Sequence, residues 1–219
     1  MVFIFDMDGV IVDNHQWHFK AWVEFGLRHG IKITKEEFSR HFGSTNELII
    51  SELFGNHLSF EEIAALGAEK ESVYRQLYKP FIEPVEGLKV FLQYLKDKGI
   101  PLALATSAPA RNVEFTLNAT GLNDFFSVIT DSSMVSRGKP DPEVYLVTAA
   151  KLAVEPGECV VFEDSVAGIQ SALDAGMHVI GVATTHKSEE LLKYVKEIIM
   201  NFDAAEIMLE KWLTNSRRN

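Results

Sequence analysis

Short runs of apolar residues, mostly β-branched or aromatic, alternate along the chain with stretches of helical periodicity. The expected strands are Val2–Phe5, Leu102–Ala105, Val128–Ile129, Val160–Phe162 and His178–Val182. The expected helices are Glu86–Lys98, Val113–Leu122, Pro142–Leu152 and Ser165–Ala175, with Gly99, Gly121 and Gly176 as helix ends, and Glu189–Lys196 and Ala204–Trp212 close the fold. Because strands that are apolar throughout are typical of sheets covered on both faces, the pattern predicts an α/β fold with a Rossmann-like, doubly wound parallel sheet.

One long interval breaks this alternation. Residues 14 to 83 carry helical patterns, such as Glu47–Phe54 and Phe60–Tyr78, with no convincing strand among them. A first strand followed by some 70 helical residues predicts an inserted helical cap domain at 14–83, with the α/β core formed by 1–13 and 84–219. Ligands of open α/β sheets bind outside the carboxyl ends of the strands, so the insertion is expected to cover the site.

Composition and charge narrow the class of protein. The 219 residues are 47% hydrophobic and 24% charged, as in ordinary globular domains, which argues against a disordered or fibrous chain. With 21 basic and 31 acidic residues the net charge is −10, so neither a nucleic acid nor a membrane surface is an expected partner. Cys159 is the single cysteine, and Met1–Asp6 lacks the features of a signal peptide. We therefore expect a cytoplasmic protein. Any anionic substrate must bind at a site whose local charge differs from the negative net charge of the whole chain.

The sharpest chemical signal follows the first expected strand. Asp6 and Asp8 are separated by one residue and precede Gly9, which permits a tight turn. Residues two apart along a strand point to the same side, so both carboxylates are expected to project into one crevice. Close carboxylates repel one another unless a cation or a shared proton intervenes, which indicates a divalent metal. The alternative is a pair of aspartates in a surface turn.

Three further segments favour a metal and phosphate site. Glu163 and Asp164 form a second carboxylate pair at the end of an expected strand; it either caps a helix or completes the oxygen ligands that Mg²⁺ prefers. Thr106 follows another strand, where its hydroxyl and backbone N–H groups can donate to an anion; the alternative is that Thr106 is a helix N-cap. Lys139 precedes Pro140, which stiffens the chain, and is either a phosphate ligand or a solvated loop lysine.

Taken in order, these four motifs resemble the signature of the haloacid dehalogenase superfamily of phosphotransferases. The motifs are Asp6/Asp8, Thr106, Lys139 and Glu163/Asp164. The helical insertion is similar to the smaller cap of that superfamily, so the resemblance covers nearly the whole chain and implies a monomer. The segments that look like the β-phosphoglucomutase-type branch are Asp6–Val10, His18–Trp22, Gly138–Pro142 and Glu163–Ile169.

The resemblance implies a role for each motif. Asp6 would be the nucleophile that becomes an aspartyl-phosphate, and Asp8 the general acid and then the base. Thr106 and Lys139 would hold the transferring phosphoryl oxygens. The implied Mg²⁺ ligands are the Asp6 carboxylate, the Asp8 main-chain carbonyl, Asp164 and, directly or through water, Glu163. Asp8 also argues against carbon–halogen cleavage, because the dehalogenase members lack this second aspartate.

A second phosphate site would distinguish a mutase from a phosphatase. Mutases of the similar branch offer an arginine in the cap loop, where this chain has Asn46, and a Ser-Lys pair where it has Ala108-Pro109. Arg111 and Lys70 could compensate, but surface positions on helices are expected for both. The expected substrate-binding residues are Gly43, Ser44, Thr45 and Asn46 of the cap loop, Ser107 and His18. The resemblance links His18 to positioning of the general acid; the alternative is an imidazole packed at a helix start.

The sequence therefore predicts a Mg²⁺-dependent phosphatase that hydrolyses a small phosphorylated metabolite, with a sugar phosphate as the leading class. A β-phosphoglucomutase-like phosphomutase is the alternative. An inorganic pyrophosphatase and a non-catalytic binding protein with this fold are further candidates. A two-component receiver domain does not fit, because it has no long insertion after the first strand.

Overall fold

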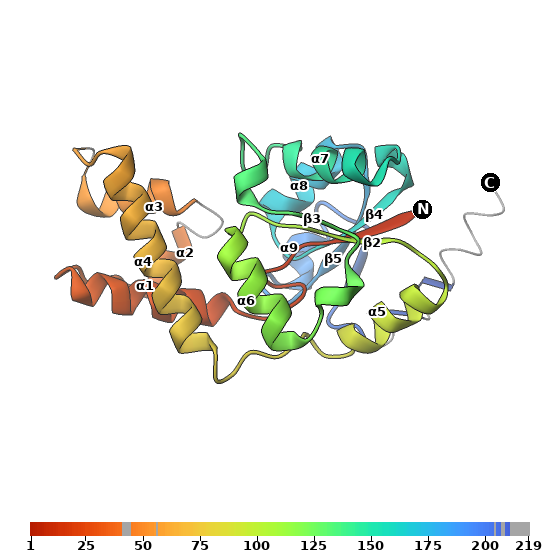
Figure 1. Cartoon of the computed structure of the whole chain (residues 1–219), viewed down its shortest axis with the longest axis horizontal. Coiled ribbons are helices and arrows are strands. Elements are labelled where there is room, and N and C mark those ends of the chain that lie inside the picture. The colour runs from red at the N-terminus through yellow and green to blue at the C-terminus, as the bar shows by residue number, and fades with distance from the viewer. Residues whose placement is uncertain (41–44, 56, 204, 207–208, 211–219) are drawn as a thin grey trace. The chain divides into compact units, whose positions relative to one another are not determined.

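In the computed structural model the chain divides into two compact units, one made of residues 1–13 and 83–219 and the other of residues 14–82 (Figure 1). The residues described are 1–40, 45–55, 57–203, 205–206 and 209–210. The segment expected at Ala204–Trp212 lies partly outside them. Among the described residues, no helix combines the length and the apolar character that a membrane span requires.

A parallel sheet of six strands forms the middle of the first unit. Its strands are β1 (Val2–Phe5), β2 (Leu102–Ala105), β3 (Val128–Thr130), β4 (Cys159–Glu163), β5 (His178–Val182) and β6 (Glu197–Ile199). They lie in the order β3-β2-β1-β4-β5-β6, the order of doubly wound sheets, in which the direction of winding reverses between β1 and β4. The predicted fold class is confirmed.

The sixth strand is the element that the sequence does not predict. In place of the single segment expected at Glu189–Lys196, the chain forms a short helix, α9 (Ser188–Leu191), and a turn that leads into β6. Residues of β6 pair with β5, with Ile180 opposite Glu197. The strand is only three residues long and half-buried at the sheet edge, so its apolar run is too short to stand out from a helical pattern.

Helices cover both faces of the sheet. They are α5 (Leu88–Asp97), α6 (Ala110–Thr120), α7 (Glu143–Leu152) and α8 (Val166–Asp174), with 3₁₀ turns at Asn123–Phe125, Ser132–Met134 and Pro156–Glu158. Val2 and Ile4 of β1 are buried in one core cluster with α7 and α8, which lie above the sheet in Figure 1. Phe5 points to the other face, where its ring centroid lies 4.9 Å from Phe162 and 6.4 Å from Phe91 of α5. Side chains of β1 point alternately to the two faces of the sheet and therefore contribute to the hydrophobic core on each face.

The regular elements described in the second unit are all helices. Its helices are α1 (His15–Arg28), α2 (Lys35–Arg40), α3 (Asn46–Phe54) and α4 (Phe60–Tyr78). A capping box starts α4: the Ser59 hydroxyl accepts from the Glu62 N–H (3.2 Å), and the Glu62 carboxylate accepts from the Ser59 N–H (2.7 Å). Trp22, Phe25 and Ile50 form the centre of its core.

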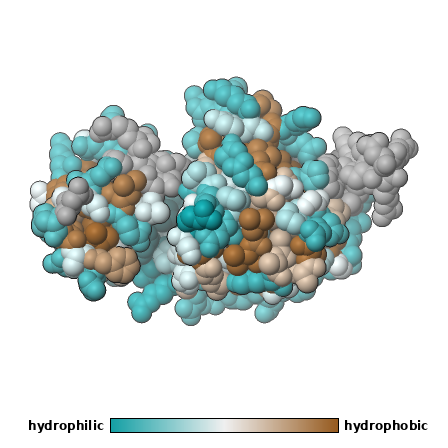
Figure 2. Space-filling model, turned by 90° about the horizontal axis from the view of Figure 1, so that it is seen from above, coloured by the Kyte–Doolittle hydropathy of each residue, from teal (hydrophilic) through white to brown (hydrophobic). Residues whose placement is uncertain are grey.

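Exposed apolar side chains on the α/β unit are scattered over several elements. Val90 of α5 is 67% exposed, and Leu192 and Met200, which follow α9 and β6, are 56% and 65% exposed. On the face drawn in Figure 2, hydrophobic patches of this unit lie among hydrophilic ones. Scattered exposed apolar residues of this kind are ordinary for globular proteins and identify no binding surface.

Candidate active site

Two of the predicted motifs meet where the winding of the sheet reverses. Phe5 pairs in register with Phe162, so the residues that follow them, Asp6 and Glu163, are neighbours at the carboxyl edge. The Asp6 N–H donates to the Phe162 carbonyl (3.0 Å) and continues the ladder by one residue. Asp6, Glu163 and Asp164 are all buried, and one carboxylate oxygen from each lies within 4.8 Å of the others. This cluster occupies the position where open α/β sheets bind ligands.

Lys139 reaches this cluster from the loop before α7. Its Nζ donates to Asp6 Oδ1 (2.9 Å), to Glu163 Oε1 (2.5 Å) and to the carbonyl of Ala105 (3.4 Å). The Lys139 side chain is 8% exposed, so the alternative of a solvated loop lysine is wrong. The ammonium bridges the carboxylates that follow β1 and end β4, which fixes the position of both.

Glu163 is held by five donors. Its Oε1 accepts from Lys139 and from the hydroxyl of Tyr145 (2.8 Å). Its Oε2 accepts from the N–H of Asp164 (3.0 Å) and from the N–H and hydroxyl of Ser165 (both 3.1 Å). Tyr145 of α7 is fully buried and was not among the predicted site residues. A buried tyrosine hydroxyl needs a partner, but nothing in the sequence around Tyr145 indicates that Glu163, 18 residues away, provides it.

The electrostatics of the cluster favour an additional cation. Burial, reinforced by the charges of Glu163 and Asp8, raises the pKa of Asp6 to about 7, although Lys139 lowers it. Burial and the charges of Glu163 and Asp6 raise the pKa of Asp164 well above its ordinary range. A single ammonium therefore does not offset the buried carboxylates. A cluster of carboxylate oxygens whose negative charge exceeds the nearby positive charge fits a hard divalent cation such as Mg²⁺.

Asp8 and Gly9 form the turn after β1. Asp8 is half-buried and forms an isolated bridge with Val12. Gly9 has a φ of +79°, and a Cβ on it would lie 1.9 Å from Asp164 Oδ2. Glycine is therefore required here both for the turn and for the approach of the Asp164 carboxylate.

Thr106 and Ser107 follow β2 at the same edge of the sheet. Thr106 is 1% exposed, and its hydroxyl oxygen accepts from the Ala108 N–H (3.0 Å). The Thr106 N–H donates to the Thr130 carbonyl (2.9 Å), so this one N–H is not available to an anion. Thr106 is not a helix cap either, since α6 begins at Ala110 with Pro109 as its N-cap. Ser107 is exposed.

Gly168 of α8 allows Glu163 to approach the helix. In most helices Gly→Ala is stabilising by roughly 0.5–1 kcal/mol, but a Cβ on Gly168 would lie 1.8 Å from Glu163 Oε1. We expect Gly168→Ala to lower the free energy of unfolding by about 1–3 kcal/mol in urea titrations. Gly157→Ala is the matched control, because a Cβ at Gly157 meets nothing within 4 Å. A Gly168→Ala variant as stable as the parent would contradict this geometry.

The helical unit contains a buried polar network. Lys70 of α4 is 2% exposed and donates to Glu71 Oε1 (2.8 Å) and to His18 Nδ1 (3.0 Å). Asn46 donates to the same Glu71 oxygen (2.8 Å). His18 stacks on Tyr74 with ring centroids 3.9 Å apart. The prediction of a surface position for Lys70 is wrong, because the adjacent Glu71 compensates its charge inside the unit.

The other residues predicted for substrate binding have local roles or lie outside the described residues. Thr45 is the N-cap of α3, where its hydroxyl accepts from the Leu48 N–H (3.4 Å). Gly43 and Ser44 fall outside the residues that the structure describes. Arg111 is exposed on α6, as predicted.

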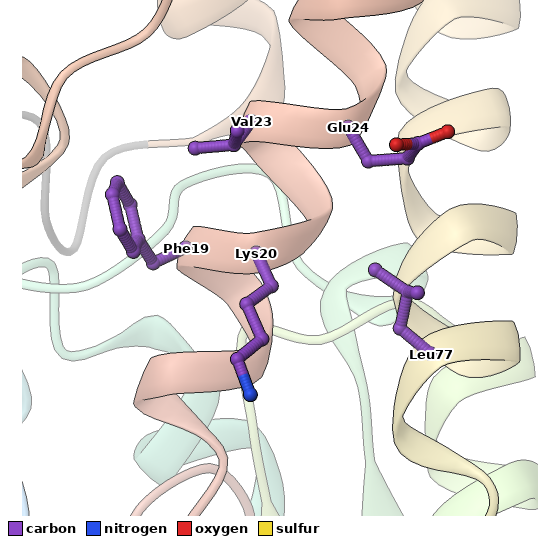
Figure 3. Close-up of a pocket in the computed structure, with 5 residues that line it drawn as sticks. All are labelled: Phe19, Lys20, Val23, Glu24 and Leu77. Atoms are coloured by element: carbon purple, nitrogen blue, oxygen red, sulfur yellow. The ribbon is translucent and has the colours of Figure 1, made fainter.

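A separate pocket lies on the helical unit between α1 and α4. Its cavity of about 330 Å³ is lined by Phe19, Lys20, Val23, Glu24 and Leu77 (Figure 3). The lining is mostly apolar and includes none of the predicted site residues. The carboxylate cluster of the α/β unit, not this pocket, therefore carries the chemistry that the sequence predicts.

The structure combines a doubly wound parallel sheet with carboxylates after β1 and β4 and a buried lysine that joins them. This combination defines a class of α/β enzymes whose active site lies at the carboxyl edge of the sheet. Comparison with known proteins specifies the family. The chain belongs to the haloacid dehalogenase-like hydrolases, whose family model matches residues 3–182. The predicted family and the prediction of a hydrolase are thereby confirmed.

Relatives and solved structures place the chain near enzymes of two activities. It is 33% identical over 216 residues to the phosphorylated carbohydrates phosphatase of Thermotoga maritima, which covers 90% of this chain and 98% of the relative. It is 32% identical over 190 residues to the β-phosphoglucomutase of Bacillus subtilis, covering 82% and 81%. The structure of β-phosphoglucomutase from Clostridium difficile is similar with a TM-score of 0.83 at 29% identity, covering 98% of this chain and 97% of the other.

Proposed function

We propose that this protein is a phosphatase that hydrolyses a small phosphorylated metabolite, with a sugar monophosphate as the leading substrate class. The observation that carries the proposal is the buried Asp6 carboxylate, 2.9 Å from the Lys139 ammonium at the β1–β4 edge. A carboxylate held beside a fixed cation can attack a phosphoryl group whose oxygens that cation also neutralises. Relatives that act on phosphorylated carbohydrates support the substrate class.

In the proposed reaction, an Asp6 oxygen forms a bond to phosphorus while the bond from phosphorus to the leaving oxygen breaks. Asp8 donates a proton to that oxygen, and the free alcohol leaves. Asp8 then accepts a proton from a water molecule whose oxygen attacks the phosphorus of the aspartyl-phosphate. The Asp6 carboxylate is regenerated and inorganic phosphate is released, so one water is consumed in each cycle. The half-buried position of Asp8, two residues after Asp6, supports this division of roles.

The chain's own residues also orient the phosphoryl group. Lys139 neutralises negative charge on the phosphoryl oxygens, and the Thr106 hydroxyl adds a donor at the end of β2. Asp6, Asp164 and the Asp8 main-chain carbonyl would hold Mg²⁺, with Glu163 bound directly or through water. When bound, Mg²⁺ would supply the positive charge that lets an anionic nucleophile and an anionic substrate approach each other.

Three features of the chain favour a phosphatase over a mutase. Ala108-Pro109 stands where the mutases offer Ser-Lys, and Asn46 stands where they offer arginine. Asn46 donates to Glu71, which also neutralises Lys70. Each charge-assisted donor missing from a second phosphate site is worth roughly 1.5–3 kcal/mol, so a bisphosphate intermediate would be held poorly. A cytoplasmic location and a monomeric state remain predictions from the sequence.

Incubation with β-glucose 1-phosphate, a trace of the bisphosphate and Mg²⁺ tests the choice between the two activities. We expect free phosphate to appear without accumulation of glucose 6-phosphate. Accumulation of glucose 6-phosphate without free phosphate would establish the mutase instead. A parallel screen of sugar phosphates and pyrophosphate identifies the substrate class, and preferential hydrolysis of pyrophosphate would favour a pyrophosphatase.

A further inference from the structure

Two adjacent threonines after β5 reach the active-site turn, although neither belongs to the four motifs. Thr184 and Thr185 follow the last residue of the strand, Val182, by two and three positions. The Thr184 hydroxyl donates to the main-chain carbonyl of Gly9 (2.5 Å). The turn that carries Asp8 is thereby tied to the neighbouring end of the sheet.

Thr185 contacts the other side of the same site. Its hydroxyl oxygen and the Asp164 carboxylate both lie beside Gly9. The position that a Cβ would occupy on Gly9 lies 1.9 Å from Asp164 Oδ2 and 2.9 Å from Thr185 Oγ1. The turn after β1, the carboxylate after β4 and the hydroxyl after β5 therefore converge at one point. Because Gly9 has no side chain, Thr185 and Asp164 can meet there.

We propose that Thr185 is a positioning residue that aims the Asp164 carboxylate at the bound divalent cation, and that Thr184 fixes the turn carrying the Asp8 carbonyl. The proposal rests on the proposed metal site. A carboxylate that ligates a metal is oriented by its remaining hydrogen bonds, and loss of such a partner typically costs 10–100-fold in metal affinity or activity. The Thr185 hydroxyl lies close enough to the Asp164 carboxylate to serve as such a partner. Neither threonine is assigned a contact with substrate.

Binding of Mn²⁺ to the full chain, followed by electron paramagnetic resonance without substrate, tests this role. Thr185→Val keeps the shape of the side chain and removes the hydroxyl; we expect it to raise the Kd for Mn²⁺ by 10–100-fold. Thr185→Ser retains the hydroxyl and is expected to bind within about threefold of the parent. Thr184→Val is expected to weaken binding less than Thr185→Val, because the carbonyl of Gly9 is not itself a proposed ligand. Wild-type affinity in Thr185→Val, or failure of serine to restore it, would overturn the proposal.

A second measurement separates positioning from general structural damage. In the proposed role, Thr185→Val raises the Mg²⁺ concentration needed for half-maximal phosphate release, and saturating Mg²⁺ restores most of kcat. A loss of kcat that excess Mg²⁺ does not restore would contradict the role. If the parent binds Mn²⁺ but releases no phosphate from any ester, the proposed function fails while the positioning role stands. If the parent does not bind Mn²⁺, the metal site and the role of Thr185 both fail.

Discussion

Asp6→Asn is expected to reduce Mg²⁺-dependent release of phosphate from p-nitrophenyl phosphate by at least about 10⁴-fold, as loss of a nucleophile does in other covalent mechanisms. The amide is nearly the same size as the carboxylate but cannot form the aspartyl-phosphate. The substitution also removes one negative charge from a cluster of three buried carboxylates that Lys139 alone does not neutralise. We therefore expect the variant to fold. The measurement is initial phosphate release, with circular dichroism to verify the fold.

Asp174→Asn is the matched control for this substitution. Asp174 is exposed at the end of α8, accepts from Gln170 (2.8 Å) and belongs to none of the motifs. We expect its activity to equal that of the parent. Parental activity in Asp6→Asn would show that Asp6 is not the nucleophile.

Glu71→Gln is expected to destabilise the protein by about 3–5 kcal/mol, because it leaves the buried Lys70 ammonium without its charged partner. Burial by itself raises the pKa of Glu71, but the charges of Lys70 and His18, with hydrogen bonds from Lys70 and Asn46, lower it to about 2 from an ordinary value of 4.5. The stabilisation from ionised Glu71 is therefore fully present above about pH 4.5 and is lost as the pH falls through about 2. Urea unfolding measured from pH 7 to pH 2 tests both the size and the sign.

A partly exposed carboxylate on the same helix as Glu71 provides the control. Glu69 of α4 pairs with His29 (3.1 Å), and the Glu69 side chain is 38% exposed. We expect Glu69→Gln to change stability by less than about 1 kcal/mol. If Glu71→Gln and Glu69→Gln unfold at the same urea concentration, other groups neutralise the Lys70 charge. The buried Lys70–Glu71 pair then does not stabilise the protein by the expected amount. A parent whose acid sensitivity equals that of Glu71→Gln would lead to the same conclusion.

The placement of the central carboxylates could be predicted because it follows from strand ends. Asp6 and Glu163 lie at the ends of apolar strands, and parallel pairing brings those ends to one edge of the sheet. The position of Lys139 followed from the family resemblance more than from its own sequence context. Its bridge between the Asp6 and Glu163 carboxylates depends on a loop path that no periodicity describes.

Long-range side-chain contacts could not be predicted in the same way. Lys70 has helical spacing compatible with a surface position, and its burial depends on contacts with His18, 52 residues away, and with its neighbour Glu71. Tyr145 and Thr185 likewise acquire their partners only when α7 and β5 dock beside β4. The short edge strand β6 forms because β5 offers it a partner, which its own three residues do not indicate.

In the proposed reaction, Asp6 carries the phosphoryl group during turnover. Borohydride reduction of the protein during turnover of a phosphate ester, followed by peptide mass spectrometry, detects this intermediate, because reduction converts an aspartyl-phosphate into homoserine. We expect homoserine at position 6 only when the ester and Mg²⁺ are both present. Phosphate release with Asp6 unreduced, or with reduction at another carboxylate such as Asp8 instead, would contradict it.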